Sequence, residues 1–316
     1  MGRGSGYGKV ILFNEHFVVH GVPGIASAID VTTDAEVEKT SGTGITIVDE
    51  RKGSIGYSEK KKSQQMESIK RMLKMMSMGP EKNSMEIWLG GNLPAFGGIG
   101  ASAASSVAIA RAISNEFKMD LSDERINEMA YEAEKAYAGT PSGIDNTAAT
   151  FGGLIWFRKD LAGGHNKIEK IIIEKPVEII MGNTGIVADT KAMVEGVAER
   201  KKKYLEKYKK IFNRAEELAF EARKFLEEFN LKKVGELMNE DHSLLQQIEV
   251  SCKELDLLVD LALEEGAYGA KMTGGGGGGC MVALTPGKEL QEKVAFSMEK
   301  EGFKVLRTKI GAQKYT

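Results

Sequence analysis

Cysteine is nearly absent from the sequence, because only Cys252 and Cys280 occur among 316 residues. Two isolated cysteines cannot build the disulfide framework of a small secreted protein, so the composition favours a reducing compartment. No apolar run approaches the ~20 residues that a membrane-spanning helix needs. The first residues also lack the charged, apolar and small-residue order of a secretory signal. We therefore expect a soluble cytoplasmic protein with no membrane partner.

An excess of either charge is missing as well. Lys and Arg number 43 and Asp and Glu 45, which gives a formal net charge of −2. A nucleic-acid-binding surface needs a basic excess, so we expect no nucleic-acid partner. Proline is scarce at 6 residues, and a hydrophobic content of 42% excludes a disordered low-complexity chain. The chain is long enough for about two domains.

Glycine, in contrast, is abundant, with 37 residues. Five glycines lie within residues 90–100, and six consecutive glycines occupy residues 274–279. Glycine allows tight turns and a close approach of the backbone to a ligand. The two clusters therefore mark candidate binding loops.

Hydrophobic periodicity predicts short strands and Gly-rich turns in the first half and long helices in the second. Strands are predicted at residues 9–13, 25–28, 32–39, 53–57, 84–89, 153–157, 171–173, 178–181, 281–284 and 304–310. A helix is predicted to begin within residues 97–106 and to continue to about residue 117. Further helices are predicted at residues 64–78, 122–137, 146–149, 190–229, 231–238, 244–265 and 288–301. The methionines of residues 64–78 could line a pocket, but a core-facing helix is favoured. The change of character predicts a boundary near residues 180–190.

The first glycine cluster leads into GGIGASAASS, residues 97–106, which follows a predicted strand and opens a helix. Free N–H groups and the helix dipole at such a position favour an anion, and a phosphate chain is the natural ligand. The segment is not a Walker A loop, because no Gly-Lys-Ser/Thr follows the spacer. A close helix–sheet packing turn is the alternative.

Two carboxylates are candidates for chemistry near phosphates. Asp145 stands in the rigid turn GTPSGIDN at the start of a predicted helix, and Glu134 lies eleven residues earlier. If they converge, one can hold Mg²⁺ and the other can handle a hydroxyl proton. Individually they also fit an N-cap and a surface position.

Lys9 precedes the apolar run VILF, and Glu15 and His16 follow it. His16 and His20 have a spacing of four, but HFVVH lacks the glutamate of HExxH and no third ligand is evident, so zinc is not expected. The remaining histidines are predicted to lie at the surface: His165 and His242.

Together these segments resemble the GHMP small-molecule kinase superfamily, and within it the mevalonate kinase family. The resemblance extends from Lys9 to the last predicted strand. It is carried by KVILFNEHFVVHG, PAFGGIGASAAS, GTPSGIDNTAATFGG and KMTGGGGGGC. The Glu-His pair and PSGIDN are more specific than the glycines. The resemblance implies an α+β, two-domain GHMP kinase fold. Residues 1–182 would form the ribosomal-protein-S5-like nucleotide- and phosphate-binding domain, and residues 183–316 a ferredoxin-like domain that completes the substrate site.

The activity implied by the resemblance is ATP- and Mg²⁺-dependent phosphorylation of the C5 hydroxyl of (R)-mevalonate, a step of isoprenoid precursor biosynthesis. The catalytic residues would be Asp145 as proton acceptor and Lys9 beside it. Ser102 and Glu134 would hold Mg²⁺. The residues implied in ATP and phosphate binding are Pro94, Gly97, Gly98, Gly100, Ala101, Ser102 and Ala103. Those implied in mevalonate binding are Glu15, His16, Thr273 and Gly143.

Three positions depart from the family pattern: Asn14 replaces a usual Gly, Ala101 replaces the first Ser of a Ser pair, and Gly275 replaces an Ala. We expect Asn14 to strain or reshape its turn and Gly275 to loosen its loop. Alternative readings are a related kinase of phosphomevalonate or of the mevalonate 3-hydroxyl, and a non-catalytic ligand sensor. Homodimers are common in the family, although no interface is readable in the sequence.

Overall fold

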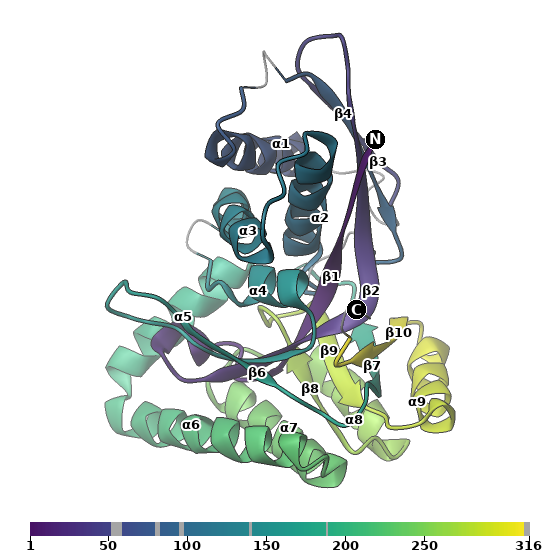
Figure 1. Cartoon of the computed structure of the whole chain (residues 1–316). Helices are drawn as coiled ribbons and strands as arrows, with labels where there is room; N and C mark the ends of the chain where they lie inside the picture. Colours follow the sequence, from purple (N-terminus) through teal and green to yellow (C-terminus); the bar gives the residue numbers. More distant parts are fainter. Residues whose placement is uncertain (52–58, 80–82, 95–97, 139–140, 188, 313–316) are drawn as a thin grey trace. The chain divides into compact units, whose positions relative to one another are not determined.

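A computed structural model describes residues 1–51, 59–79, 83–94, 98–138, 141–187 and 189–312 (Figure 1). The chain packs into two compact units. Unit 1 comprises Met1–Lys9 and Asp30–Gly152, and unit 2 comprises Val10–Ile29 and Gly153–Thr316. The boundary expected after residue 182 separates the two family domains and not these two compact units, and it stays a prediction.

The strands are β1 (Gly2–Phe13), β2 (Gly24–Lys39), β3 (Ile45–Asp49), β4 (Met85–Gly91), β5 (Leu154–Arg158), β6 (Lys167–Ile171), β7 (Val177–Asn183), β8 (Gly269–Thr273), β9 (Cys280–Leu284) and β10 (Lys304–Ile310). The helices are η1 (Val18–His20), α1 (Glu59–Met75), α2 (Ala101–Glu116), α3 (Asp123–Ala138), α4 (Ile144–Phe151), α5 (Thr190–Lys203), α6 (Leu205–Glu227), α7 (Leu231–Gln247), α8 (Lys253–Glu264) and α9 (Lys288–Lys300). The mixed helix and sheet content confirms the predicted α+β class.

Unit 1 is a sheet with helices on one face. The second half of β2 pairs antiparallel with β4, β4 pairs parallel with β3, and β1 pairs with β2. Alternation along β2 buries Ala35 and Val37 and leaves Asp34 and Glu38 exposed. The buried side chains join those of α1, α2 and α3 in one core, and Figure 1 shows these three helices on the same side of the sheet. Met72 of α1 is fully buried there, which confirms the core-facing prediction for this helix.

A third group of glycines, on β1, lets this strand press against α2. A Cβ atom added to Gly2, Gly4 or Gly6 would lie 2.2–2.3 Å from a backbone carbonyl oxygen of α2. Side chains alternate between the two faces of a strand, so glycines at every second position make one face of β1 flat. Only this flat face allows helix α2, whose first turn carries the predicted phosphate loop, to approach so closely.

Unit 2 is organised around β7, which pairs antiparallel with β10 and β9, and β9 pairs with β8. The first half of β2 pairs with β5, which pairs with β6. Helices α7 and α8 pack against β8, and α9 packs against β7 and β10. Figure 1 shows α6 and α7 side by side.

Several predicted elements differ in length or number. The helix predicted over residues 190–229 is two helices, because Tyr204 (φ −122°, ψ 55°) leaves the helical region between α5 and α6. The four basic residues before it suit a helix C-terminus, where the dipole favours positive charge. β3 and β8 were not predicted, and β1 is longer than expected. The strand predicted at residues 53–57 lies outside the described residues.

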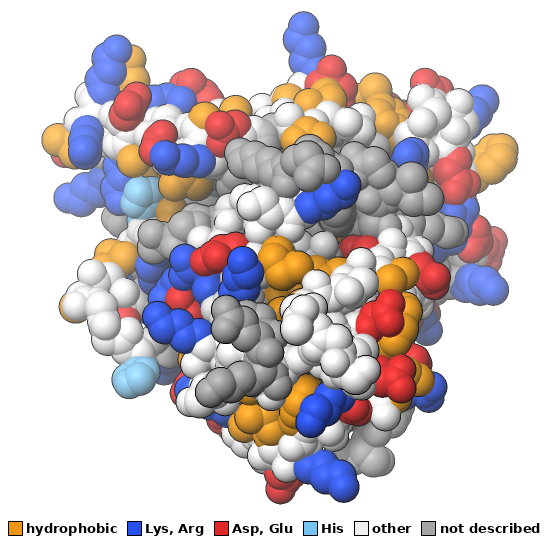
Figure 2. All heavy atoms as spheres, turned by 90° about the horizontal axis from the view of Figure 1, so that it is seen from above, with side chains coloured by type: hydrophobic (Ala, Val, Ile, Leu, Met, Phe, Trp, Pro, Cys, Tyr) orange, Lys and Arg blue, Asp and Glu red, His pale blue; other side chains and the backbone are white. Residues whose placement is uncertain are grey.

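On the face drawn in Figure 2, acidic and basic side chains are interspersed, and hydrophobic side chains lie between them in patches. This agrees with a net charge near zero. In the part of the chain that the structure describes, no helix is long and apolar enough to span a bilayer.

Candidate active site

Unit 1 brings Lys9 and Asp145 together. The Nζ atom of Lys9 lies 3.0 Å from Oδ1 of Asp145, and the two side chains are 5% and 34% exposed. The Lys9 amide donates to the carbonyl of Ile99 at 2.9 Å, which ties the middle of β1 to the segment before α2. Asp145 stands in the first turn of α4, after Gly143, whose φ of 92° forms the tight turn. The pair thus offers a half-exposed carboxylate held by a buried ammonium group.

A second carboxylate of unit 1, Glu134 on α3, is almost completely buried. Ser102 at the start of α2 donates a hydrogen bond to its Oε2 at 3.1 Å, and Oε1 is buried without a hydrogen-bond partner among the described residues. Burial, reinforced by the charge of Asp145, raises the pKa of Glu134 to about 8. An unpartnered buried carboxylate oxygen beside a serine hydroxyl is a suitable ligand set for a hard cation such as Mg²⁺.

The predicted phosphate loop enters α2 through left-handed glycines. Gly98 has φ 95° and Gly100 has φ 72°, a region that favours glycine. A Cβ atom on Gly100 would lie 2.6 Å from Cγ of Lys9, so the loop packs directly on the catalytic candidate. Among the described residues no side chain caps the helix at Gly100. The first N–H groups of an α-helix have no partner within the helix, so those of Ala101, Ser102 and Ala103 are suited to bind an anion.

The two remaining predicted phosphate-loop positions carry less structural information. Pro94 is partly buried after Leu93. Gly97 lies outside the described residues.

In unit 2, Glu15 belongs to a buried charged cluster. Nζ of Lys271 bonds Oε1 of Glu15 and lies 3.3 Å from Oδ2 of Asp241, and none of these three side chains is more than 1% exposed. Burial raises the pKa of Glu15 and of Asp241, and the Lys271 charge opposes both shifts. Oε2 of Glu15 is buried without a hydrogen-bond partner among the described residues.

His16 and Thr273 also lie in unit 2. The Nε2 atom of His16 lies 3.1 Å from the carbonyl oxygen of Gly275, so Nε2 carries the proton and donates. Burial lowers the pKa of His16 to about 4, which makes the ring neutral at pH 7. The Thr273 hydroxyl donates to the Ile11 carbonyl at 3.0 Å and accepts from the Ile11 amide at 3.2 Å. Thr273 therefore fixes β8 to the second half of β1.

Two of the three departures from the family pattern, Asn14 and Gly275, have local explanations. Asn14 has φ 70°, and Asn tolerates this region better than most residues. Its Nδ2 donates to the carbonyls of Pro23 (2.7 Å) and Ala215 (2.8 Å), so the side chain anchors the turn. A Cβ atom on Gly275 would lie 2.2 Å from Oγ1 of Thr190, so glycine makes room for the start of α5.

Sequence reasoning missed Asp241 and placed His242 at the surface, which is wrong because His242 is buried. A signal was present for Asp241. It follows Val234 and Met238 at helical spacing and precedes Leu245, so it falls on the apolar stripe of α7. A carboxylate on that stripe predicts a buried partner. The surface prediction for His165 is confirmed, because this side chain is exposed.

Arg51 in unit 1 was also not singled out. It is buried, forms an ion pair with Asp49 at 2.6 Å, and donates to Ser105 on the first turns of α2. No motif in the sequence pointed to this contact, which depends on the strand β3 that was not predicted.

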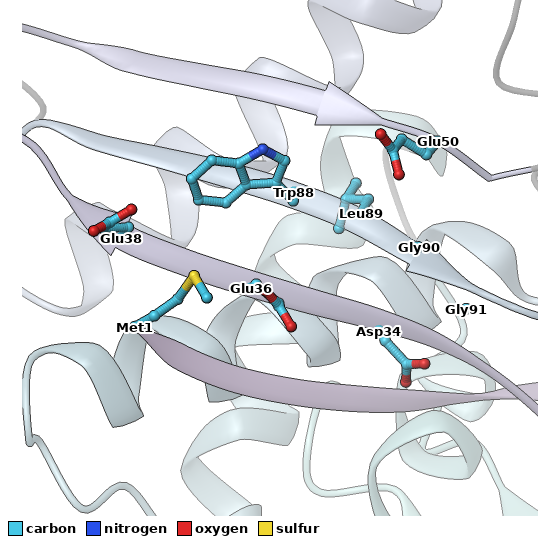
Figure 3. A pocket seen from close by; sticks show the side chains of 9 residues that line it. All are labelled: Met1, Asp34, Glu36, Glu38, Glu50, Trp88, Leu89, Gly90 and Gly91. Carbon is cyan, nitrogen blue, oxygen red and sulfur yellow. The ribbon is translucent and has the colours of Figure 1, made fainter.

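A groove of about 510 Å³ lies on the outer face of the unit 1 sheet (Figure 3). Its acidic side chains come from β2 and from Glu50 after β3, and Trp88 of β4 lies beside them. The acidic lining residues are Asp34, Glu36, Glu38 and Glu50. Like charges repel, so this face disfavours a polyphosphate, and no predicted site residue lines it.

Comparisons with known proteins match the chain over nearly its whole length. Residues 67–153 match the GHMP kinases N terminal domain, and residues 222–304 match the GHMP kinases C terminal domain. A mevalonate kinase of Pyrococcus abyssi is 33% identical over 96% of this chain and 94% of its own length. The crystal structure of L. major mevalonate kinase in complex with R-mevalonate is 34% identical, with a TM-score of 0.93 over 100% of this chain and 97% of that one. The Methanococcus jannaschii mevalonate kinase structure is 25% identical, with a TM-score of 0.82 over 98% of each chain.

Proposed function

Because the chain belongs to the mevalonate kinase family of the GHMP kinases, we propose that it transfers the γ-phosphoryl group of ATP to the C5 hydroxyl of (R)-mevalonate. The products are ADP and mevalonate 5-phosphate. The observation that carries the proposal is the Lys9–Asp145 ion pair in the same unit as the Ser102–Glu134 pair. Phosphoryl transfer depends mainly on positioning and on charge stabilisation, and these groups supply both.

In the proposed reaction Asp145 accepts the proton of the C5 hydroxyl while the oxygen bonds the γ-phosphorus and the bond to the β-phosphate oxygen breaks. Lys9 holds the Asp145 carboxylate by their ion pair, and its ammonium group stabilises the negative charge that develops. A positioned general base of this kind contributes about 10²–10⁴-fold in rate. The 34% exposure of Asp145 leaves its carboxylate accessible to a substrate hydroxyl.

The start of α2 would receive the triphosphate. Backbone N–H groups of the turn through Gly98 and Gly100 and of the first helical residues would donate to phosphate oxygens. Pro94 and Gly97 belong to the same proposed segment. The small side chain of Ala101 keeps this approach open, whereas the Ala103 side chain is buried in the core of unit 1 and only its backbone N–H group would take part.

Ser102 and Glu134 are the proposed Mg²⁺ ligands. The fit rests on the unpartnered, buried Oε1 of Glu134 and on the hydroxyl beside its Oε2. When bound, Mg²⁺ would neutralise charge on the β- and γ-phosphates. The raised pKa of Glu134 favours its neutral, protonated form, which avoids an uncompensated buried charge.

Mevalonate would contact Glu15 and His16 through its hydroxyl and carboxylate end. The unpartnered Oε2 of Glu15 is an acceptor for a substrate hydroxyl. The neutral His16 ring adds Nδ1, a buried acceptor without a partner among the described residues. Thr273 of unit 2, on β8, and Gly143 of unit 1, in the turn before α4, are the remaining residues proposed for mevalonate binding.

Neither Cys252 nor Cys280 forms a disulfide, which supports a reducing, cytoplasmic location. A homodimer is the assembly that membership of the family supports, and light scattering of the purified chain measures it.

A coupled ADP-release assay with mevalonate, phosphomevalonate, galactose and homoserine tests the proposal. We expect turnover with mevalonate far above that with the other three. Preferential turnover of phosphomevalonate would identify the related kinase instead. Absence of turnover with all four, together with binding of mevalonate, would identify a sensor.

A further inference from the structure

Asp241 on α7 contacts two different parts of the substrate-binding candidate in unit 2. Its Oδ2 accepts the backbone amide of Asn14 at 3.0 Å and lies 3.3 Å from Nζ of Lys271. Lys271 in turn bonds Oε1 of Glu15. One fully buried carboxylate oxygen therefore holds both the residue before Glu15 and the cation that pairs with Glu15.

The turn that carries Glu15 is fixed on several sides. Asn14 has a left-handed backbone conformation, and its Nδ2 donates to the carbonyls of Pro23 and of Ala215 on α6. Its backbone amide is bound by Asp241 on α7. Contacts with α6 and α7 thus fix the position of the main chain just before Glu15. The contact with Lys271 fixes the orientation of the Glu15 carboxylate.

The free-energy cost of burying these charges together is high for a contact that is purely structural. Two carboxylates and one ammonium group are buried together, and burying charges costs several kcal/mol per ion before pairing. Replacement of such clusters by apolar side chains is often neutral or stabilising. In this cluster Lys271 uses its charge to bond Oε1 of Glu15, and Oε2 is left without a partner among the described residues.

We propose that Asp241 is a positioning residue for Glu15. It orients Lys271 and the Asn14 amide so that Oε1 of Glu15 is occupied and Oε2 is presented to a hydroxyl of the substrate. This inference rests on the proposed role of Glu15 in binding mevalonate. In this proposal Asp241 itself does not contact the substrate.

The alternative is that Asp241 merely pins α7 to β8. The chain offers a matched control for that role. Oδ1 of Asn239 accepts the amide of Ala270 at 2.8 Å, which joins the same helix to the same strand. A purely structural contribution predicts that Asp241→Asn and Asn239→Ala both lower the melting temperature and that neither changes the KM for mevalonate selectively.

The test measures kcat, both KM values and the affinity for mevalonate alone by calorimetry. In Asp241→Asn we expect the KM and Kd for mevalonate to rise about 10–100-fold, the effect of weakening a hydrogen bond to a charged group. The KM for ATP should stay within about twofold, and Asn239→Ala should leave both mevalonate constants unchanged. A folded Asp241→Asn variant with normal mevalonate constants overturns the proposal.

A double-mutant cycle tests whether Asp241 acts through Glu15. Coupled residues show non-additive effects, so Asp241→Asn added to Glu15→Gln should cause little further loss of mevalonate affinity. Full additivity contradicts the proposal. If Asp241→Asn does not fold, Lys271→Gln interrupts the same chain of contacts and should raise the KM for mevalonate alone, whereas a normal KM overturns the inference. Lack of mevalonate turnover in the wild type would instead refute the proposed function.

Discussion

Lys9 and Asp145, 136 positions apart in the sequence, form an ion pair of 3.0 Å in which only the aspartate is appreciably exposed. Gly100 packs against the Lys9 side chain, and Gly143 forms the turn that starts the helix of Asp145. The pair is therefore positioned by two left-handed glycines, and it supplies the base and the neighbouring positive charge of the proposed reaction.

Loss of either member of the pair should reduce catalysis and preserve nucleotide binding. For Asp145→Ala we expect kcat to fall by about 10²–10⁴-fold, and for Lys9→Met we also expect a lower kcat. Fluorescent nucleotide titration should give an ATP affinity within a few-fold of wild type. Asp123→Ala is a control for the loss of a carboxylate charge. Asp123 is the first residue of α3 and pairs with Arg111 of α2 rather than with Lys9. A near-normal kcat in Asp145→Ala would show that Asp145 is not the general base.

The Mg²⁺ requirement should depend on pH through Glu134. Below its pKa of about 8 the carboxyl is protonated, and metal ligation requires the deprotonated form. We expect the Mg²⁺ concentration for half-maximal activity to decrease by up to about tenfold per pH unit between pH 6 and 8, and then to level off.

Two variants on helix α3 check this dependence. Glu134→Gln should raise the Mg²⁺ requirement and abolish its slope with pH. Glu132→Gln should leave both unchanged, because Glu132 pairs with Arg71 and Lys135 instead. A requirement for Mg²⁺ that is independent of pH in the wild type would rule out Glu134 as a ligand.

The glycines of β1 should be intolerant of any side chain. In Gly4→Ala the new Cβ would meet the carbonyl oxygen of Ala108 at 2.3 Å. Overpacking of this kind costs about 1–3 kcal/mol, so urea denaturation should show a free energy of unfolding lowered by at least that amount. Gly90→Ala is the control, since its Cβ would have no neighbour within 4 Å, and we expect a change within about 0.5 kcal/mol. Equal stability of the two variants would mean that α2 does not pack closely on β1.

Buried histidines should make the folded state sensitive to acid. Nδ1 of His242 accepts the amide of Met272, so protonation would break this bond, and burial lowers the pKa of His242. The unfolded state then binds more protons below pH 6.5. The contribution of His242 to the free energy of unfolding should therefore fall as the pH decreases below 6.5, by up to about 1.4 kcal/mol per pH unit, whereas the raised pKa values of Glu15 and Glu134 act in the opposite direction. Urea denaturation between pH 7 and 5 measures this.

His242→Gln removes the titrating group and keeps an acceptor for the Met272 amide. Relative to the wild type, this variant should gain stability as the pH falls from 7 to 5, because it lacks the His242 contribution. His165→Gln, at an exposed position, should behave like the wild type. Identical pH profiles for all three proteins would show that His242 does not titrate on unfolding.

Motifs with fixed spacing allowed much of the fold and most candidate residues to be predicted. Lys9, Ser102, Glu134 and Asp145 stand in local patterns, and their side chains do come together in unit 1. Elements with strong periodicity, such as β10, were predicted with the bounds that the structure has.

Features that depend on partners distant in sequence could not be predicted. The Asp241–Lys271–Glu15 cluster joins residues up to 256 positions apart, and no local pattern indicates which charges are buried together. The break between α5 and α6 at Tyr204 could not be predicted either, because the helical spacing of apolar residues continues on both sides of Tyr204. The glycines of β1 were visible in the sequence, but their function depends on the close packing of α2.

The central claim is most directly tested by the position of the phosphate in the product. Purified protein, ATP, Mg²⁺ and (R)-mevalonate are incubated, and the product is analysed by phosphorus NMR with proton coupling. Phosphate on the C5 oxygen couples to the two protons of a CH₂ group, and we predict this triplet together with one ADP released per phosphate transferred. A singlet from phosphate on the C3 oxygen, or no transfer to mevalonate at all, would contradict the account.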